Sequence, residues 1–192
     1  MGKRRIIVAI TGASGACYGV RALEMLRDLD DVETHLIISS AGLRTAMEED
    51  DRSADEIRAL ADVCYPHKDI GAALASGSFK CEGMLVAPCS IKTLSAIAHC
   101  YSDDLVSRAA DVCLKERRRL VLMVRETPLH AGHIALMDAA TRSGAIIMPP
   151  VPSFYTRPKT LDDLVSQTVG RALDLFDFDH PQVRRWREGG AE

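Results

Sequence analysis

A glycine-rich turn near the start of the chain has the residue types of an anion-binding loop. An apolar, β-branched run over residues 6–10 passes into Gly-Ala-Ser-Gly at residues 12–15, after which a helical pattern begins. The first N–H groups of a helix have no partner within the helix and lie at the positive end of its dipole. Gly12, Ala13 and Ser14 therefore predict a phosphate site, although such turns also serve tight packing of a strand against a helix.

A second polar turn of the same kind follows a later apolar run. Residues 83–87 form that run, and Pro-Cys-Ser at residues 88–90 interrupts it before a helical pattern over residues 91–99. Ser90 is placed to cap this helix, with Thr93 at its third position. Because parallel strands end at the same edge of a sheet, the two turns predict one ligand cleft.

The ligand of this cleft is not expected to be a dinucleotide. A dinucleotide-binding unit has an acidic residue at the end of its second strand, where the carboxylate holds the ribose hydroxyls. This chain has Ser39 there, after the apolar run at residues 33–38. Serine caps helices and binds phosphate well, but it does not clamp a ribose.

Charged residues at the ends of predicted elements give further candidates. Arg125 and Glu126 directly follow the apolar run at residues 120–124, at the sheet edge where ligands bind. Arg108 and Lys115 are seven residues apart on a predicted helix and therefore share one face, either as an anion site or as two separate surface cations.

Two glutamates end the predicted helix at residues 41–50. Glu48 and Glu49 oppose the dipole of that helix, so local stability does not explain them. One of them is placed for function, or both belong to a solvated acidic turn.

Strand and helix patterns alternate along the whole chain, which predicts an α/β fold with a doubly wound parallel sheet. We expect a single domain over residues 1–175 and a tail over residues 176–192 that packs on a neighbouring subunit, Trp186 included. The predicted strands are 6–10, 33–38, 63–65, 83–87, 120–124 and 145–148. The predicted helices are 16–29, 41–50, 53–61, 91–99, 103–117, 129–143, which Gly144 ends, and 160–175.

Composition excludes several classes of protein. The net charge of −3 gives no support for binding nucleic acid, and no apolar run approaches the roughly 18 residues of a membrane helix. The chain passes straight into its first strand without a secretory segment, so we expect a cytoplasmic protein. The six cysteines form no C-x-x-C pair, which disfavours structural zinc and a disulfide framework. For Cys89 we expect packing in the core rather than nucleophilic catalysis.

Three separated motifs together resemble one family. They are Pro-Cys-Ser-Ile-Lys-Thr-Leu-Ser at residues 88–95, Arg-Glu-Thr-Pro-Leu-His at residues 125–130 and Pro-Pro-Val-Pro-Ser-Phe-Tyr at residues 149–155. In this order they resemble the UbiX-type flavin prenyltransferases, formerly called aromatic acid decarboxylases. The resemblance runs from the first strand to about Arg171.

The resemblance implies a flavodoxin-like enzyme that binds reduced FMN as co-substrate and is independent of metal ions. It would transfer a dimethylallyl group from dimethylallyl phosphate to flavin N5 and C6. The product, prenylated FMN, would serve a UbiD-type decarboxylase, and a flavin reductase would supply the reduced cofactor. The family's site lies between the subunits of a dodecamer, so a homo-oligomer is implied.

The resemblance also implies residue roles. FMN would be held by Gly12, Ala13, Ser14, Ser39, Ser90, Ile91, Lys92, Thr93 and Arg125. The prenyl phosphate would be bound by Arg108, Lys115, Glu126, Tyr155 and Arg171. Ser14 and Glu49 would handle protons, with Glu48 as the alternative carboxylate.

The residues are consistent with this chemistry, because a phosphate leaving group needs fixed cations as its negative charge grows. No Asp-rich motif for a metal-bound diphosphate is visible, which favours a monophosphate donor, although the sequence leaves the diphosphate open. Two alternatives stay open. One is an FMN-dependent cysteine decarboxylase, whose Pro-Ala-Ser-Ala-Asn-Thr-like turn differs from Pro-Cys-Ser-Ile-Lys-Thr here. The other is a non-catalytic FMN carrier that serves a decarboxylase.

Overall fold

The computed structural model describes residues 2–186 and contains one six-stranded parallel sheet with the strand order β3-β2-β1-β4-β5-β6. The strands are β1 (Arg4–Ile10), β2 (Val32–Ile38), β3 (Val63–Pro66), β4 (Gly83–Cys89), β5 (Arg119–Val124) and β6 (Ile146–Ile147). The helices are α1 (Ala16–Arg27), α2 (Ser40–Glu49), α3 (Ala54–Arg58), η1 (Ala73–Ala75), α4 (Ile91–Ala98), α5 (Leu105–Lys115), α6 (Ala131–Arg142) and α7 (Leu161–Asp174).

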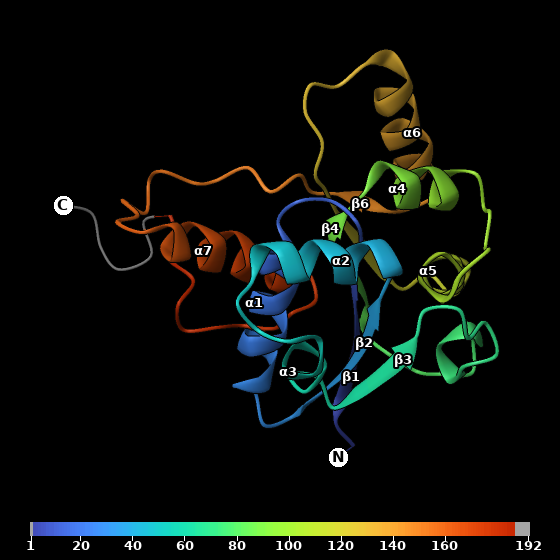
Figure 1. The fold of residues 1–192 in the computed structure, drawn as a ribbon, viewed down its shortest axis with the longest axis horizontal. Coiled ribbons are helices and arrows are strands. Elements are labelled where there is room, and N and C mark those ends of the chain that lie inside the picture. Colours follow the sequence, from blue (N-terminus) through green and yellow to red (C-terminus); the bar gives the residue numbers. More distant parts are fainter. Residues whose placement is uncertain (1, 187–192) are drawn as a thin grey trace.

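Alternating side chains of the central strands build two separate cores, one on each face of the sheet. Ile6 and Val8 of β1 pack with α1, α2, α3 and α7, whereas Ile7 and Ala9 pack with α4, α5 and α6. All four side chains are almost fully buried, as expected for a strand covered on both faces. The fold is therefore the doubly wound α/β sheet that the sequence predicts (Figure 1).

The sheet reverses its winding direction between β1 and β4. From β1 the chain winds outward through β2 to β3, and it then returns to β4 on the other side of β1 and continues to β5 and β6. In open parallel sheets such a reversal leaves a crevice at the carboxyl ends of the two strands, where ligands bind. The turns after β1 and β4 lie at this crevice.

The structure departs from the predicted elements mainly at their ends. Strand β4 continues through residues 88 and 89 instead of ending at Ala87, with an irregularity in its pairing with β5 between Val86 and Cys89. The helix predicted at residues 53–61 is only Ala54–Arg58. Gly144 ends α6 with φ +106°, the left-handed conformation expected of a helix stop.

The segment after α7 packs at first on its own chain, which differs from the expected tail. Phe176 and Phe178 are each 1% exposed in the core beside α1, and the Arg4 guanidinium lies 4.1 Å from the centre of the Phe178 ring. The domain therefore continues past residue 175. The rest of the expected tail, residues 187–192, lies outside the described residues. Among the helices of residues 2–186, none has both the length and the apolar character needed to cross a membrane.

Candidate active site

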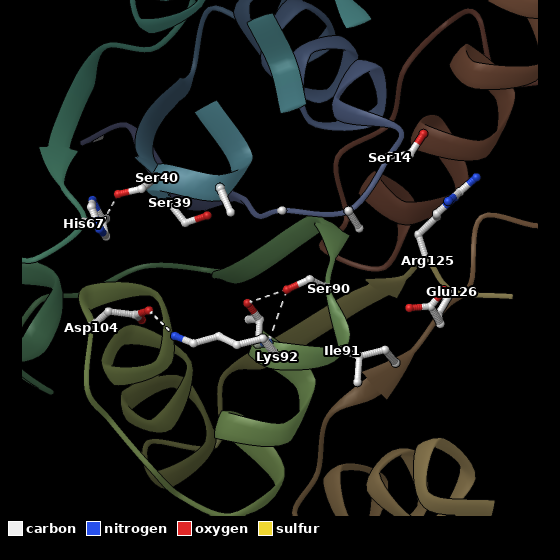
Figure 2. A pocket seen from close by; sticks show the side chains of 14 residues that line it. Ser14, Ser39, Ser40, His67, Ser90, Ile91, Lys92, Asp104, Arg125 and Glu126 are labelled. Atoms are coloured by element: carbon white, nitrogen blue, oxygen red, sulfur yellow. Dashed lines mark hydrogen bonds and ion pairs between the residues drawn. The ribbon is translucent and has the colours of Figure 1, made fainter. Parts of the chain in front are cut away.

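A pocket of about 520 Å³ opens at the carboxyl ends of β1, β2, β4 and β5 (Figure 2). All nine residues expected to hold FMN line it, together with Glu126. The remaining lining residues, which the sequence did not indicate, are Ser40, Ala41, His67 and Asp104. The two polar turns identified in the sequence thus form opposite walls of one cavity.

A buried hydroxyl joins these two walls. Thr11 is 1% exposed, and its Oγ1 donates to the carbonyl of Pro88 at 2.8 Å and accepts from the backbone N–H of Ser90 at 2.9 Å. Gly12 packs against α2 so closely that a Cβ there would lie 2.4 Å from the Cβ of Ala41. Gly12 is therefore required by packing, and contacts within the chain hold the loop against α2.

Two helices begin at the pocket, each capped by a serine. Ser39 Oγ accepts from the N–H of Gly42 at 3.0 Å at the start of α2. Ser90 Oγ accepts from the N–H of Thr93 at 3.3 Å and donates to Thr93 Oγ1 at 3.1 Å at the start of α4. The positive ends of two helix dipoles and several hydroxyl groups thus meet in one cavity, which is the composition of a phosphate site.

Glu49 caps a helix that is distant in sequence. Gly15 occupies the N-cap position of α1 with φ +100° and has no side chain to cap it. Glu49 Oε2 instead accepts from the N–H of Gly15 at 2.8 Å and of Ala16 at 3.0 Å. The carboxylate that opposes the dipole of α2 therefore complements the dipole of α1. Glu48 is exposed and pairs with Arg44 at 3.1 Å, so of the two glutamates only Glu49 adjoins the glycine loop.

The surroundings of Glu49 favour its charged form. Partial burial alone would raise the pKa of the carboxyl, but hydrogen bonds from the Ser14 hydroxyl and from the N–H groups of Gly15 and Ala16 outweigh it. The Arg125 charge acts in the same direction, and the net effect lowers the pKa of Glu49. Glu49 is thus ionised at neutral pH and able to accept a proton.

Arg125 and Glu126 lie where the sequence places them, at the end of β5. The N–H of Arg125 donates to the carbonyl of Cys89 at 3.1 Å, which ties this segment to β4. The two side chains and Ser14 gather at one end of the pocket (Figure 2). Within residues 2–186, Arg125 forms no ion pair with a carboxylate, so its charge is available to a ligand.

The opposite end of the pocket contains polar residues that sequence reasoning missed. Ser40 Oγ and His67 Nε2 lie 3.1 Å apart, and Lys92 Nζ donates to Asp104 Oδ2 at 3.0 Å. Asp104 also caps α5 in a reciprocal arrangement with Ser107, a spacing visible in the sequence. His67 follows an edge strand and has no comparable local signal.

Arg108 and Lys115 share one face of α5, as predicted from their spacing. Both lie against the segment at residues 72–79, where Arg108 Nε donates to the carbonyl of Ala75 at 3.2 Å. Lys115 pairs with the neighbouring Glu116 beside Gly77. Neither residue lines the pocket.

Tyr155 and Arg171 lie on the other side of the sheet. Arg171 belongs to α7 and pairs with Asp174, and the Tyr155 hydroxyl donates to the carbonyl of Arg184 at 3.3 Å. The cores under α7 and α5 are separate, and the two helices lie at opposite ends of the view in Figure 1. A single chain therefore does not bring together the residues expected around the prenyl phosphate.

Cys89 is fully buried in the core at the end of β4. Burial raises the pKa of its thiol far above the ordinary range, so no thiolate forms at neutral pH. The expected packing role of Cys89 is consistent with this burial. Among the described residues, no cluster of three or more His, Cys, Asp or Glu side chains is arranged to hold a metal ion.

Comparisons with known proteins agree on one family. A sequence profile described as Flavoprotein matches residues 1–172. Flavin prenyltransferase UbiX of Escherichia coli strain K12 is 57% identical over 186 residues, which cover 96% of this chain and 98% of that protein.

Two solved structures extend the similarity to three dimensions. AnUbiX (PadA1) in complex with FMN and dimethylallyl pyrophosphate is 51% identical, with a TM-score of 0.95 over 99% of this chain and 100% of that one. A dodecameric FMN-dependent Ubix-like decarboxylase from Escherichia coli O157:H7 is 48% identical, with a TM-score of 0.93 over 95% of this chain and 99% of that one. The peptidyl-cysteine decarboxylase EpiD, at 16% identity and a TM-score of 0.65, shares only the fold.

Proposed function

The chain belongs to the flavoprotein family and, within it, to the UbiX-type flavin prenyltransferases, and on this premise we propose how its residues serve the reaction. The protein transfers a dimethylallyl group from a dimethylallyl phosphate ester to FMN. Reduced FMN supplies the ring atoms N5 and C6 that accept the group. The observation that carries the assignment of roles is the meeting of two capped helix N-termini, Arg125 and Ser14 in one pocket, with Glu49 bound to the backbone of the glycine loop that carries Ser14.

The pocket fits FMN in size and in the order of its groups. Its volume of about 520 Å³ is in the usual range of a ligand cavity. The N-termini of α2 and α4, with Ser39, Ser90 and Thr93, would hold the phosphate. The flavin ring would then extend along Ile91 toward Ser14 and Arg125 at the other end (Figure 2). Lys92 contributes less charge than its type suggests, because Asp104 already pairs with it.

Glu49 and Ser14 are the groups we assign to proton transfer. Bond formation at C6 of the flavin releases a proton, and a base near the ring is needed to take it. Glu49 is ionised, and the Ser14 side chain, which helps to lower the pKa of Glu49, lines the pocket. The Ser14 hydroxyl would therefore relay the proton to the carboxylate.

The prenyl phosphate requires cations from two subunits. When the allylic C–O bond breaks, the phosphate leaves with the electron pair, and fixed positive charges stabilise it. Arg108 and Lys115 of one subunit would meet Tyr155 and Arg171 of another, with Arg125 and Glu126 at the edge of the site. The homo-oligomer therefore completes the active site, and a dodecamer like that of the similar decarboxylase would do so.

The product suits a separate enzyme that uses prenylated FMN, so we assign a UbiD-type decarboxylase as its recipient and a flavin reductase as the source of reduced FMN. A cytoplasmic location is part of this proposal. It is supported by the six cysteines, all of which are free thiols in the structure, as in a reducing compartment.

One assay tests the proposed function. The purified protein is incubated without oxygen with reduced FMN and either dimethylallyl monophosphate or dimethylallyl diphosphate, and the released flavin is weighed by mass spectrometry. We expect the mass of one prenyl group to be added, with faster turnover of the monophosphate. Unmodified flavin from both donors, under conditions in which FMN binds, would contradict the proposal.

A further inference from the structure

Two cysteines with no role in the proposed reaction lie side by side on the face of the sheet that carries α5. Cys113, on α5, is 1% exposed, and Cys81, just before β4, is partly buried against the same core. The two thiols are close enough for each to shift the pKa of the other. The two sulfur atoms are therefore already neighbours, although 32 residues separate them in the sequence.

Arg118 holds this pair against a surface turn. Its Nη1 lies 3.9 Å from Cys81 Sγ and donates to the carbonyl of Phe79 at 2.6 Å, while Nη2 donates to the carbonyl of Gly77 at 2.7 Å. The backbone N–H of Arg118 donates to the carbonyl of Cys113 at 2.8 Å. One residue thus fixes the position of both cysteines and places a positive charge next to one of them.

The two thiols differ in acidity. The neighbouring Cys113 thiol and the charge of Arg118 lower the pKa of Cys81 to about 7, although burial opposes this shift. The neighbouring Cys81 and deeper burial raise the pKa of Cys113. At neutral pH Cys81 is thus partly a thiolate, the form that reacts with oxidants, and Cys113 is a protonated thiol beside it.

We propose that Cys81 and Cys113 form a peroxide-sensitive dithiol that closes reversibly to a disulfide. The Cys81 sulfur attacks hydrogen peroxide, an S–O bond forms, the O–O bond breaks, and the leaving hydroxide takes a proton to become water. The Cys113 sulfur, losing its proton, then attacks the Cys81 sulfenic acid, so that an S–S bond forms, the S–O bond breaks and a second water leaves. Two thiols and one peroxide give one disulfide and two waters.

Closing this bond would alter the surface that carries two proposed phosphate ligands. The turn held by Arg118 contacts the exposed face of α5, and a Cβ at Gly77 would lie 2.8 Å from Lys115 Nζ. Arg108 donates to the adjacent carbonyl of Ala75 at 3.2 Å. A disulfide removes the thiolate that attracts Arg118 and draws Cys81 toward α5. The consequence for catalysis, though not the disulfide itself, rests on the proposed function.

Cys64, which lies outside the dithiol, provides an internal control. Cys64 is exposed on β3, and its pKa is raised by burial of the thiol. Its thiol is thus less acidic than an ordinary cysteine thiol, and β3 is a different element from those of the dithiol, whose cysteines lie just before β4 and on α5. At neutral pH we therefore expect peroxide to react with Cys81 about ten-fold faster than with Cys64, in line with the larger thiolate fraction.

The chemical test uses the full-length protein. It is treated with hydrogen peroxide, free thiols are alkylated, and the peptides are analysed by mass spectrometry with and without reduction. We expect a disulfide-linked Cys81–Cys113 peptide that disappears after reduction with dithiothreitol. The matched control Cys64→Ser should form the same linked peptide. In Cys113→Ser we expect a Cys81 sulfenic acid that a dimedone reagent traps. The proposal would be overturned if Cys81 were oxidised irreversibly while Cys113 remained a free thiol that is alkylated. Faster oxidation of Cys64 than of Cys81 would also overturn it.

A second measurement separates this inference from the proposed function. We expect the oxidised protein to lose about ten-fold or more of its prenyl transfer and to regain it with dithiothreitol, while FMN affinity stays unchanged. Unchanged turnover of a protein shown to carry the disulfide would remove the link to catalysis. If the untreated protein transfers no prenyl group, the proposed function fails while the disulfide result stands.

Discussion

The two halves of the proposed active site are assembled in different ways. The FMN half consists of four turns at one sheet edge, joined by backbone hydrogen bonds and by the buried Thr11 hydroxyl within one chain. The prenyl-phosphate half consists of residues on α5 and near α7, which one chain holds on opposite faces of the sheet. In the proposed site, the residues assigned to FMN thus come from one chain, whereas those assigned to the donor would come together only in an assembly.

The difference also appears in the partners of the charged groups. Arg125, in the FMN half, forms no ion pair with a carboxylate of the described chain, whereas Lys115 pairs with Glu116 and Arg171 pairs with Asp174. The Lys115–Glu116 pair is exposed and therefore contributes little to stability, whereas the Asp174 carboxylate is largely buried and also pairs with Arg185. In the proposed site, Lys115 and Arg171 would exchange these partners for the ligand phosphate when a second subunit approaches, and Asp174 would keep Arg185.

The largest expected effect concerns the two cations of the donor half. Lys115→Ala and Arg171→Ala should each lower turnover of the prenyl phosphate about 10²- to 10³-fold, since each removes a charged group that stabilises the leaving phosphate. FMN should still bind, which titration of flavin fluorescence measures. Loss of FMN binding in either variant would mean that the residue belongs to the cofactor half.

Mixed assemblies of these two variants test whether two subunits share the site. When the variants are coexpressed in equal amounts, about a quarter of the sites should contain both an intact Lys115 and an intact Arg171 if the residues come from different subunits. Turnover of doubly tagged mixed oligomers should then recover to about that fraction. No recovery would place both residues in the same chain's site and would remove the contrast between the two halves.

Glu49 is expected to affect chemistry without affecting the binding of either ligand. Glu49→Gln should slow prenyl transfer about 10²-fold, the typical contribution of a general base, with FMN and donor still bound. The matched control is Glu48→Gln, because Glu48 is exposed and pairs with Arg44 on its own helix. If Glu48→Gln slowed prenyl transfer while Glu49→Gln left it unchanged, the roles of the two carboxylates would be reversed.

Ser90 should affect both FMN and the fold, by smaller amounts. Ser90→Ala removes the cap of α4, so we expect a loss of about 1 kcal/mol in the free energy of unfolding and about ten-fold weaker FMN binding. Ser53→Ala is the matched control, because Ser53 caps α3 away from the pocket. It should lose similar stability and retain FMN affinity, as thermal unfolding and flavin titration would report. Equal loss of FMN affinity in both variants would indicate a general effect of reduced stability.

The smallest effect is a pH dependence of stability. The folded-state pKa of Glu49 is lowered, so the unfolded chain binds this proton first as the pH falls. The contribution of Glu49 is complete above the usual glutamate pKa of about 4.3 and is lost as the pH falls through the lower folded-state value. The difference in the free energy of unfolding between the native protein and Glu49→Gln, measured by denaturant titration, should therefore decrease as the pH falls through this range. A constant difference would contradict the capping role of Glu49.

The features predictable from sequence were those with local signals. Apolar runs located the strands, and serines before helical patterns located the caps Ser39 and Ser90. Those caps define the FMN half almost completely, because the carboxyl ends of parallel strands necessarily meet at one edge. The Asp104 cap had the same local signal, but nothing in the sequence indicated that it faces the pocket.

Features that depend on distant contacts could not be predicted from local patterns. Local patterns did not separate Glu49, which the family resemblance favoured, from its alternative Glu48. Only the packing of α1 against the end of α2 shows which carboxylate meets the N–H groups of Gly15 and Ala16. His67 is brought to the pocket by an edge strand without any pattern of its own. In the proposed site, the donor residues gather only in the oligomer, because one chain keeps them on opposite faces of the sheet.

The Thr11 hydroxyl has a thermodynamic consequence for the cofactor. Because it joins the turns after β1 and β4 with two buried hydrogen bonds, the order of these turns is established when the chain folds. FMN then meets a rigid surface, and little loop entropy is lost on binding. Thr11→Val, which keeps the shape and removes the hydroxyl, should therefore make the entropy of FMN binding more unfavourable in calorimetry. Thr11 would thus influence the affinity of this site for FMN although it does not line the pocket.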